Sequence, residues 1–128
     1  MKLLLDTHTF IWWASEPSKL STQVLTLCQN PLNEVCLSVA SVWEMQIKIQ
    51  LGKMQIGHSL VDMIAQHQKT NRVQLLAINL AHVLILDSLP LYHRDPFDRL
   101  LIAQAIEEGA TLLTRDAIFR NYPVQIRW

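Results

Sequence analysis

The chain begins with a short apolar run, Leu3 to Leu5, that ends directly at the carboxylate of Asp6. An unbroken apolar run of this length is typical of a strand buried on both faces, as the strands of parallel sheets are. The polar residues that follow can begin a helix, with Thr7 or Thr9 as its N-cap. Because the carboxyl ends of central strands border the crevice of an open α/β sheet, we expect Asp6 at the floor of that crevice. A lone aspartate can also be an ordinary loop or capping residue, so this assignment depends on the other acids.

Apolar and amphipathic segments alternate along the rest of the chain. We expect further strands at 34–39, 73–78, 111–114 and 124–128, and helices at 10–14, 19–29, 41–51, 59–68, 80–86 and 99–108. Strands that alternate with helices form βαβ crossovers, which cover both faces of a parallel sheet. The sequence therefore predicts a three-layer α/β/α domain with a central parallel sheet of four or five strands.

Serines and glycines mark where several of these helices begin and end. We expect Ser18 as the N-cap of the second helix, and Ser38 or Ser41 as the N-cap of the third. Gly52 and Gly109 follow helices at a position that a left-handed residue commonly occupies.

The composition limits the classes of protein to which this chain can belong. With 50% hydrophobic and 17% charged residues, the 128-residue chain can fill the core of one domain and leave an apolar face for a partner. The formal net charge of +0 lacks the basic excess of sequence-independent nucleic-acid binders, although acids that hold a metal hide a local basic surface from this total. Cys28 and Cys36 are too few for a disulfide framework, and we expect buried thiols in a reducing cytoplasm. No stretch is long and apolar enough to span a membrane.

Two further acids stand where the predicted sheet can bring them close to Asp6. Asp116 follows the fourth predicted strand as Asp6 follows the first, so the two acids meet if these strands are neighbours. Asp116 can instead cap a short helix at 117–121. Glu44 lies in the third predicted helix, where it either faces the crevice or pairs at the surface with Lys48, four residues on.

Asp95 and Asp98 precede and enter the last predicted helix. We expect Asp95 to be an N-cap, because Pro96 suits the first helical position. Asp98 then stands at the third position, where its carboxylate completes a capping box. That role does not exclude a metal contact, because the first turn of a helix after a crossover lies at the crevice.

Carboxylates that gather at one crevice require a group that offsets their negative charge. Two like charges about 4 Å apart repel by roughly 4 kcal/mol at an effective dielectric of 20, so such a cluster needs protons or a cation. The oxygens are hard ligands, and no Cys–His set has zinc spacing, so we expect Mg²⁺ or Mn²⁺. Such a site activates water and neutralises charge as a phosphodiester is attacked. With 3 glycines in the chain, a P-loop and a dinucleotide-binding loop are excluded.

Four motifs follow one another over nearly the whole chain: LLDTH at 4–8, SVWE at 41–44, DPFDRLLIAQA at 95–105 and LLTRD at 112–116. With these motifs the chain resembles the PIN-domain ribonucleases, specifically the VapC-type toxins of prokaryotic toxin–antitoxin pairs. The resemblance implies a single PIN domain over 1–128, an acidic Mg²⁺ or Mn²⁺ site and endonucleolytic cleavage of RNA. It also implies a cytoplasmic homodimer that a small antitoxin inhibits.

The resemblance assigns roles to residues at the matching positions. The catalytic acids are Asp6, Glu44, Asp98 and Asp116, of which Asp6, Asp98 and Asp116 are expected to hold the metal. Supporting residues are Thr7, Asp95 as a helix cap, and Thr114 as a hydrogen-bond donor to Asp6 or to a metal-bound water. We expect His8 to hydrogen-bond the backbone rather than a metal.

Other side chains near these motifs are candidates for contacts with RNA or a partner protein. The basic residues that flank the acids and can hold RNA phosphates are Lys48, Arg94, Arg99 and Arg115. Aromatic residues after the first turn are expected in the core or at a partner surface, although unpaired bases can also stack on them; these are Phe10, Trp12 and Trp13. An apolar groove for an antitoxin helix is expected at Leu20, Val24, Ile49 and Met54.

Two other functions remain open from the sequence. A phosphatase or phosphoacceptor domain on a similar sheet requires a second acid two residues after Asp6, where His8 stands instead. A dimerising or binding module without catalysis requires that the acids are scattered in the fold. The second alternative therefore depends on where the acids lie.

Overall fold

Five parallel strands form the centre of the structure, a computed structural model that describes residues 1–128. The strands are β1 (Lys2–Leu5), β2 (Glu34–Ser38), β3 (Gln74–Leu76), β4 (Thr111–Leu113) and β5 (Ile126–Arg127). They lie in the order β3-β2-β1-β4-β5, and every neighbouring pair is parallel. The predicted parallel sheet is confirmed, and β1 and β4 are neighbours, which is the condition under which Asp6 and Asp116 were expected to meet.

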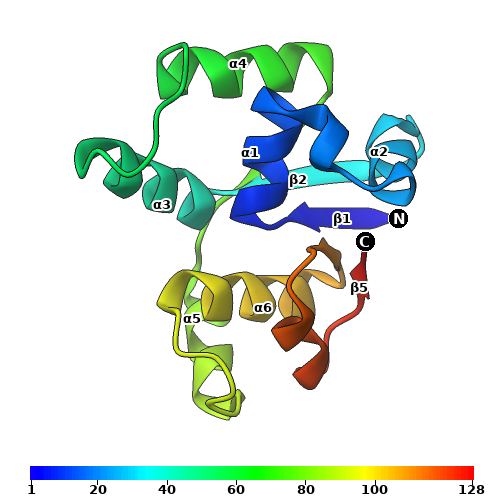
Figure 1. The fold of residues 1–128 in the computed structure, drawn as a ribbon. Coiled ribbons are helices and arrows are strands. Elements are labelled where there is room, and N and C mark those ends of the chain that lie inside the picture. Colours follow the sequence, from blue (N-terminus) through cyan, green and yellow to red (C-terminus); the bar gives the residue numbers. More distant parts are fainter.

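Helices cover both faces of this sheet, as Figure 1 shows, and the predicted three layers are confirmed. The α-helices are α1 (Thr7–Ser15), α2 (Thr22–Gln29), α3 (Val39–Gln50), α4 (Leu60–Thr70), α5 (Leu80–Ile85) and α6 (Pro96–Glu108). Three short 3-10 helices complete the fold: η1 (Pro17–Lys19), η2 (Leu86–Ser88) and η3 (Ala117–Asn121). In Figure 1, α1, α3 and α4 lie above the sheet, and α5 and α6 lie below it.

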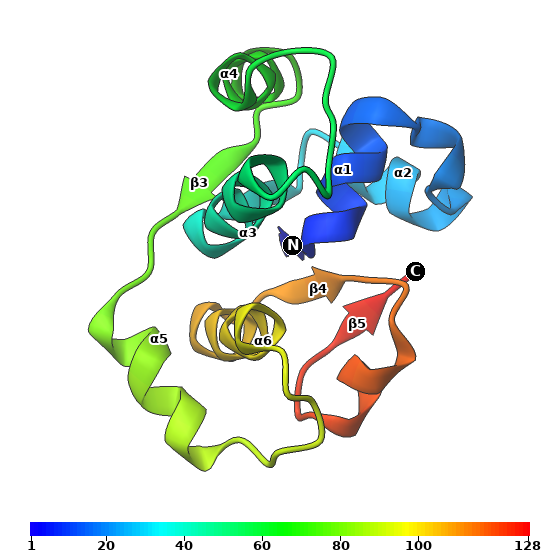
Figure 2. The ribbon, with the colours of Figure 1, turned by 60° about the vertical axis from the view of Figure 1, so that its left-hand side comes forward.

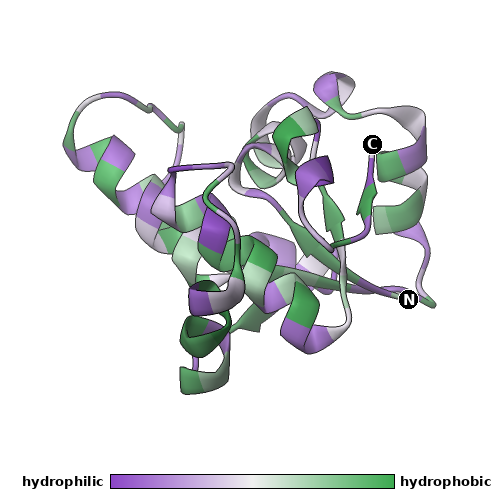
Figure 3. Ribbon diagram, turned by 90° about the horizontal axis from the view of Figure 1, so that it is seen from below, coloured by the Kyte–Doolittle hydropathy of each residue, from purple (hydrophilic) through white to green (hydrophobic).

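The alternation of side chains along β1 builds a separate core on each face of the sheet. Leu3 and Leu5 pack in the cluster that contains Phe10 of α1, whereas Leu4 packs in the cluster that contains Leu101 of α6. All five side chains are fully buried. In Figure 3 the central strands are coloured mainly as hydrophobic, while the helices change between hydrophilic and hydrophobic residues along their length. Burial on both faces fixes the end of β1, and hence the position of Asp6.

The helix predicted at 19–29 is shorter in the structure. The segment divides into η1 and α2, and α2 has Ser21 rather than Ser18 as its N-cap. Leu20 lies between the two helices in an extended conformation and is buried in the core. The helix is interrupted at Leu20 because an extended residue cannot continue a helix. The extended backbone goes together with the burial of the Leu20 side chain in the core.

The other predicted caps agree better with the structure. Ser38 is the N-cap of α3, and its hydroxyl accepts from the Ala40 N–H at 3.0 Å. Gly52 and Gly109 both adopt left-handed conformations, with φ of +69° and +62°. These caps fix where α3 and α6, the helices that carry Glu44 and Asp98, begin or end.

The predicted apolar groove is partly wrong. Leu20 and Val24 belong to the core and cannot line a surface. Ile49 and Met54 do line an open groove of about 700 Å³ between the end of α3 and the start of α4. The groove also contains Ile56 and therefore remains a candidate partner surface.

Both thiols are buried, as predicted. Burial raises the pKa of Cys28 to about 12, and burial with the nearby Glu34 carboxylate raises the pKa of Cys36 to about 11. Neither thiol is therefore a nucleophile at neutral pH. None of the helices combines the length and the apolar character that a membrane span requires.

Arg72 follows α4 in the left-handed region, with φ of +55°. This conformation lets the Val73 N–H donate to the His67 carbonyl at 3.3 Å and ends the helix. The left-handed conformation of an L-residue destabilises the folded state by about 1–2 kcal/mol. A new glycine lowers the free energy of unfolding by only about 0.4–1 kcal/mol, because it increases the entropy of the unfolded chain. Arg72→Gly should therefore raise the free energy of unfolding by about 0.5–1 kcal/mol, measured by urea denaturation. The matched control is Asn71→Gly, which should destabilise, because Asn71 has φ of −111°.

Candidate active site

Asp6 is buried at the end of β1 and is itself the N-cap of α1, so the N-cap predicted at Thr7 or Thr9 is wrong. Its Oδ1 accepts from the Thr9 N–H at 2.9 Å and lies 3.1 Å from the Thr9 hydroxyl, which is 2.8 Å from the Leu113 carbonyl and can donate to only one of the two. Its Oδ2 accepts from the Thr114 hydroxyl at 2.6 Å. These hydrogen bonds hold the Asp6 carboxylate in place at the start of α1.

Thr114 connects Asp6 to Asp116. Its hydroxyl donates to Asp6 and accepts from the Asp116 N–H at 3.1 Å. The predicted hydrogen bond from Thr114 to Asp6 is thus confirmed. Asp116 is the N-cap of η3, where its Oδ1 accepts from the Ile118 N–H at 3.1 Å, yet its side chain stays exposed at the mouth of the crevice. Asp116 therefore meets both expectations, since it caps a helix and lies near Asp6.

Asp98 lies in the first turn of α6, which Asp95 caps as predicted. Asp95 Oδ1 accepts from the Phe97 N–H at 2.8 Å and from the Asp98 N–H at 3.0 Å. The predicted capping box is absent, because the Asp98 carboxylate does not return to the N-cap. Its Oδ2 lies instead 2.7 Å from Nε2 of His93, in the loop before the helix.

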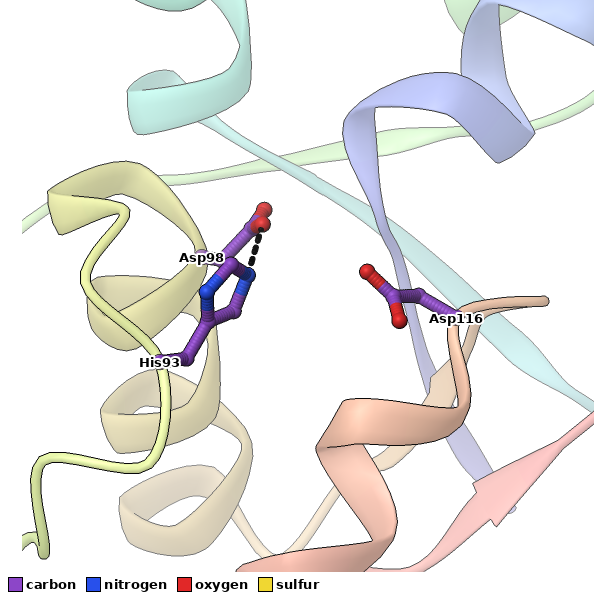
Figure 4. Close-up of side chains that lie close together, drawn as sticks. All are labelled: His93, Asp98 and Asp116. Atoms are coloured by element: carbon purple, nitrogen blue, oxygen red, sulfur yellow. Dashed lines mark hydrogen bonds and ion pairs between the residues drawn. The ribbon is translucent and has the colours of Figure 1, made fainter.

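Three carboxylates that are remote in sequence line one cavity of about 320 Å³. Its lining residues are Asp6, His8, Trp12, Asp98, Arg115 and Asp116. Figure 4 shows Asp98 and His93 on one side of the crevice and Asp116 facing them from the other. One ligand atom from each of these three lies within 4.8 Å of the others. This arrangement is suited to a single bound cation; the group contains His93 and not Asp6, which shares only the cavity with Asp98 and Asp116.

The pKa of Asp98 also indicates a site that would favour a bound cation. Burial, helped by the Asp95 and Asp6 carboxylates, raises the pKa of Asp98 from its ordinary value of 3.8 to about 6, and the hydrogen bond from His93 opposes this rise. A carboxylate with a raised pKa in a crevice is common at functional sites. A cation in the cavity would offset the cost of its charge.

Glu44 is buried but does not line the cavity. Its Oε1 accepts from the Thr7 hydroxyl at 2.8 Å, and its Oε2 forms an ion pair with Lys48 at 2.9 Å. The Thr7 hydroxyl also lies 2.9 Å from that of Ser41. Glu44 therefore contacts the residue that follows Asp6, but of its two predicted positions the structure has the pair with Lys48 and not a place in the cavity.

The predicted phosphate-binding residues separate into different roles. Arg115 lines the cavity, with its guanidinium 5.9 Å from the centre of the Trp12 ring. Lys48 is paired with Glu44. Arg99 is turned toward the backbone, where Nη1 donates to the Pro90 carbonyl at 2.7 Å and Nη2 to two further carbonyls at 3.3 Å. Arg99 thus holds the loop before α6 and does not line the cavity.

His8 also differs from the prediction, because its ring makes no hydrogen bond to the backbone. It lies exposed at the cavity, with its ring tilted against Trp12 at a centroid distance of 5.8 Å. Sequence reasoning missed His93 and Thr9 as neighbours of the acids. His93 could have been found from its spacing, because it lies five residues before Asp98, on the other side of the start of α6.

Comparisons with known proteins agree with this geometry. A sequence model of the PIN domain matches residues 3–125. Ribonuclease VapC22 of Mycobacterium tuberculosis (strain ATCC 25618 / H37Rv) is 28% identical over 123 residues, which cover 94% of this chain and 91% of the relative.

Two solved structures have the same fold at low sequence identity. VapBC2 from Rickettsia felis, bound to a DNA fragment from its promoter, contains a chain with a TM-score of 0.75 and 18% identity, covering 99% of this chain and 98% of that one. DNA-bound VapBC from Salmonella typhimurium contains a chain with a TM-score of 0.71 and 16% identity, covering 99% and 97%. Sheet order, clustered acids and the sequence match lead to one assignment: the chain belongs to the PIN-domain family.

Proposed function

We propose that this chain is a cytoplasmic, metal-dependent endoribonuclease and the toxin of a toxin–antitoxin pair. The observation that carries the proposal is the convergence of Asp6, Asp98 and Asp116 on one cavity at the carboxyl ends of β1 and β4. The resemblance to a protein named Ribonuclease VapC22 supports RNA as the substrate, since that relative covers nearly the whole chain. The names of the structural neighbours as VapBC complexes support an antitoxin partner.

The donor set of the cavity fits Mg²⁺ or Mn²⁺. Carboxylate oxygens from Asp6, Asp98 and Asp116 are hard ligands, and burial, followed by the Asp95 and Asp6 carboxylates, raises the pKa of Asp98, a cost of its charge that a cation would offset. When bound, such an ion lowers the pKa of water and neutralises charge on a phosphodiester. Asp6 is the most firmly held of the three proposed ligands, because the Thr9 N–H and the Thr114 hydroxyl each donate to one of its oxygens.

The other residues prepare the site and orient the RNA. Arg115 is the cation at the cavity mouth without a carboxylate partner, and it is placed to hold a phosphate next to the scissile one. Thr114 keeps Asp6 and Asp116 in register. Glu44, neutralised by Lys48, acts through Thr7 on the first turn of α1, and so on the orientation of Asp6.

The proposal is tested by incubating the purified protein with single-stranded and structured RNA, with chelator, Mg²⁺ or Mn²⁺. We expect cleavage only with metal. Asp6→Asn, purified in the same way, controls for contaminating ribonuclease, and Asp87→Asn, an exposed acid in η2, controls for charge. Metal-independent cutting, or equal cutting by Asp6→Asn, would contradict the proposed site. Metal binding without any cutting would favour a binding module.

We also propose that the antitoxin occupies the groove between α3 and α4. Ile49, Met54, Ile56 and Leu60 give this groove an apolar floor of the kind that receives an amphipathic helix. Met54→Lys should weaken capture of a co-expressed antitoxin without changing RNA cleavage.

Homodimer formation is a further part of the proposal. The exposed apolar side chains that support it come from α3, β3 and α5, which lie along one side of the molecule in Figure 2: Val39, Trp43, Leu75, Leu80, Val83 and Leu84. Leu84→Glu buries a charge in such an interface and should raise the dimer dissociation constant by more than about tenfold. Analytical ultracentrifugation measures this, with Leu32→Glu as the matched control in a loop elsewhere. Equal sedimentation of both variants as dimers would exclude this interface.

A further inference from the structure

The two oxygens of the Asp98 carboxylate have different surroundings. Its Oδ2 lies 2.7 Å from Nε2 of His93, and the dashed line in Figure 4 marks this contact. The other oxygen, Oδ1, has no hydrogen-bond partner in the protein, although Asp98 lines the cavity. When Asp98 is ionised its carboxylate only accepts hydrogen bonds, so this contact then places a proton on Nε2 of His93. His93 thus occupies one oxygen and leaves the other available.

His93 is itself held by the segment that follows Asp116. Its backbone N–H donates to the Tyr122 hydroxyl at 2.7 Å. Its ring meets the Phe119 ring edge to face, with centroids 5.9 Å apart and planes at 87°. Phe119 and Tyr122 are both buried, so they form a rigid support. The segment that begins at Asp116 therefore also positions the group that orients Asp98.

We propose that His93 is a positioning residue of the metal site, which holds Asp98 Oδ2 so that Oδ1 is presented to the cation, and that Tyr122 sets its position. The inference rests on the proposed function, because it requires that Asp98 binds the metal. Groups that orient a metal ligand by hydrogen bonding typically change metal affinity about 10–100-fold when they are removed. His93 lies close enough to Asp98 and Asp116 to be a ligand itself, and the experiment separates the two roles.

The test measures Mn²⁺ binding by calorimetry and by the electron paramagnetic resonance signal of free Mn²⁺. His93→Leu removes the donor and should weaken Mn²⁺ binding about 10–100-fold. His93→Gln keeps an N–H donor at a similar reach and should retain most of the affinity. Pulsed electron paramagnetic resonance of bound Mn²⁺ should detect no ¹⁴N coupling from an imidazole in the wild-type protein.

The link to Tyr122 is tested by a double-mutant cycle. Tyr122→Phe removes the acceptor of the His93 N–H and should weaken Mn²⁺ binding in the wild-type background. In the His93→Leu background the same change should have little effect, because the connection is already lost. Melting temperatures of all variants without metal separate this coupling from a general loss of folding.

Several results would overturn the inference. His93→Leu that binds Mn²⁺ as tightly as wild type excludes a positioning role, and so does His93→Gln that loses as much affinity as His93→Leu with an unchanged melting temperature. A ¹⁴N coupling that disappears in His93→Leu would make His93 a ligand instead; the variant is needed because His8 lines the same cavity. In all three cases the proposed function would still hold if the wild-type protein cuts RNA in the presence of metal. A wild-type protein that binds no Mn²⁺ would overturn both proposals.

Discussion

Asp98→Asn should abolish most RNA cleavage and, at the same time, make the metal-free protein more stable at neutral pH. Changes to residues that only orient a ligand already cost about 10–100-fold. Loss of a charged ligand should therefore cost more than about 100-fold in cleavage rate. The gain in stability follows from the same charge, since the fold holds Asp98 in surroundings that disfavour its ionised form.

The sign of the stability effect follows from the pKa of Asp98. Folding raises this pKa from 3.8 to about 6, so the charged group opposes folding once it ionises in the unfolded chain. The cost is absent below the unfolded value and complete above about pH 6. The full rise corresponds to about 3 kcal/mol. Because the side chain is 22% exposed, we expect a gain of about 1–2 kcal/mol from Asp98→Asn.

Urea denaturation in chelator at about pH 4 and about pH 7.5 measures this difference. The advantage of Asp98→Asn should be present at the higher pH and nearly vanish at the lower one. Asp87→Asn should match wild type at both. Added Mn²⁺ should raise the melting temperature of wild type and leave Asp98→Asn nearly unchanged. An equal advantage at both pH values would mean that the charge of Asp98 is not the cause.

Thr114→Val should cost both stability and activity. The valine has nearly the same shape but cannot donate to Asp6 Oδ2 or accept from the Asp116 N–H. A buried carboxylate that loses a charge-assisted hydrogen bond costs about 1.5–3 kcal/mol. We therefore expect a loss of about 2–3 kcal/mol in unfolding free energy. Cleavage should fall about 10–100-fold, because Asp6 loses the group that orients it.

Thr114→Ser is the matched control, because it keeps the hydroxyl and removes only the methyl group. It should retain most of the activity, and its loss of stability should stay near about 1 kcal/mol. Both variants are compared by urea denaturation and by initial cleavage rates at saturating metal. If serine fails as badly as valine, packing of the methyl group rather than the hydrogen bond decides the role of Thr114.

The sequence was sufficient for the sheet and for part of the site. Leu3 to Leu5 could only be buried on both faces, and this fixed the central strand and the depth of Asp6. The strand over Thr111–Leu113 ends in the same way, so the nearness of Asp116 could be predicted once the two strands were taken as neighbours. Backbone topology alone determines these positions.

Side-chain direction could not be predicted in the same way. Asp98 has the right spacing for a capping box, yet its carboxylate turns to His93, whose place depends on Phe119 and Tyr122 far along the chain. Arg99 follows an acid in sequence, but loop carbonyls capture its guanidinium. In each case the deciding partner comes from a tertiary contact that no local pattern encodes.

The dependence of the site on the end of the chain has a consequence for how the protein is made. Asp116, and the Phe119 and Tyr122 side chains that support His93, are translated after Asp6 and Asp98, and Trp128 packs against Trp12 with ring centroids 5.8 Å apart. An N-terminal portion can begin to fold during synthesis, but it contains only part of the acid set. On the proposed function, a nascent polypeptide that has not yet reached Tyr122 should lack part of the acid set or of its support and should not cut RNA.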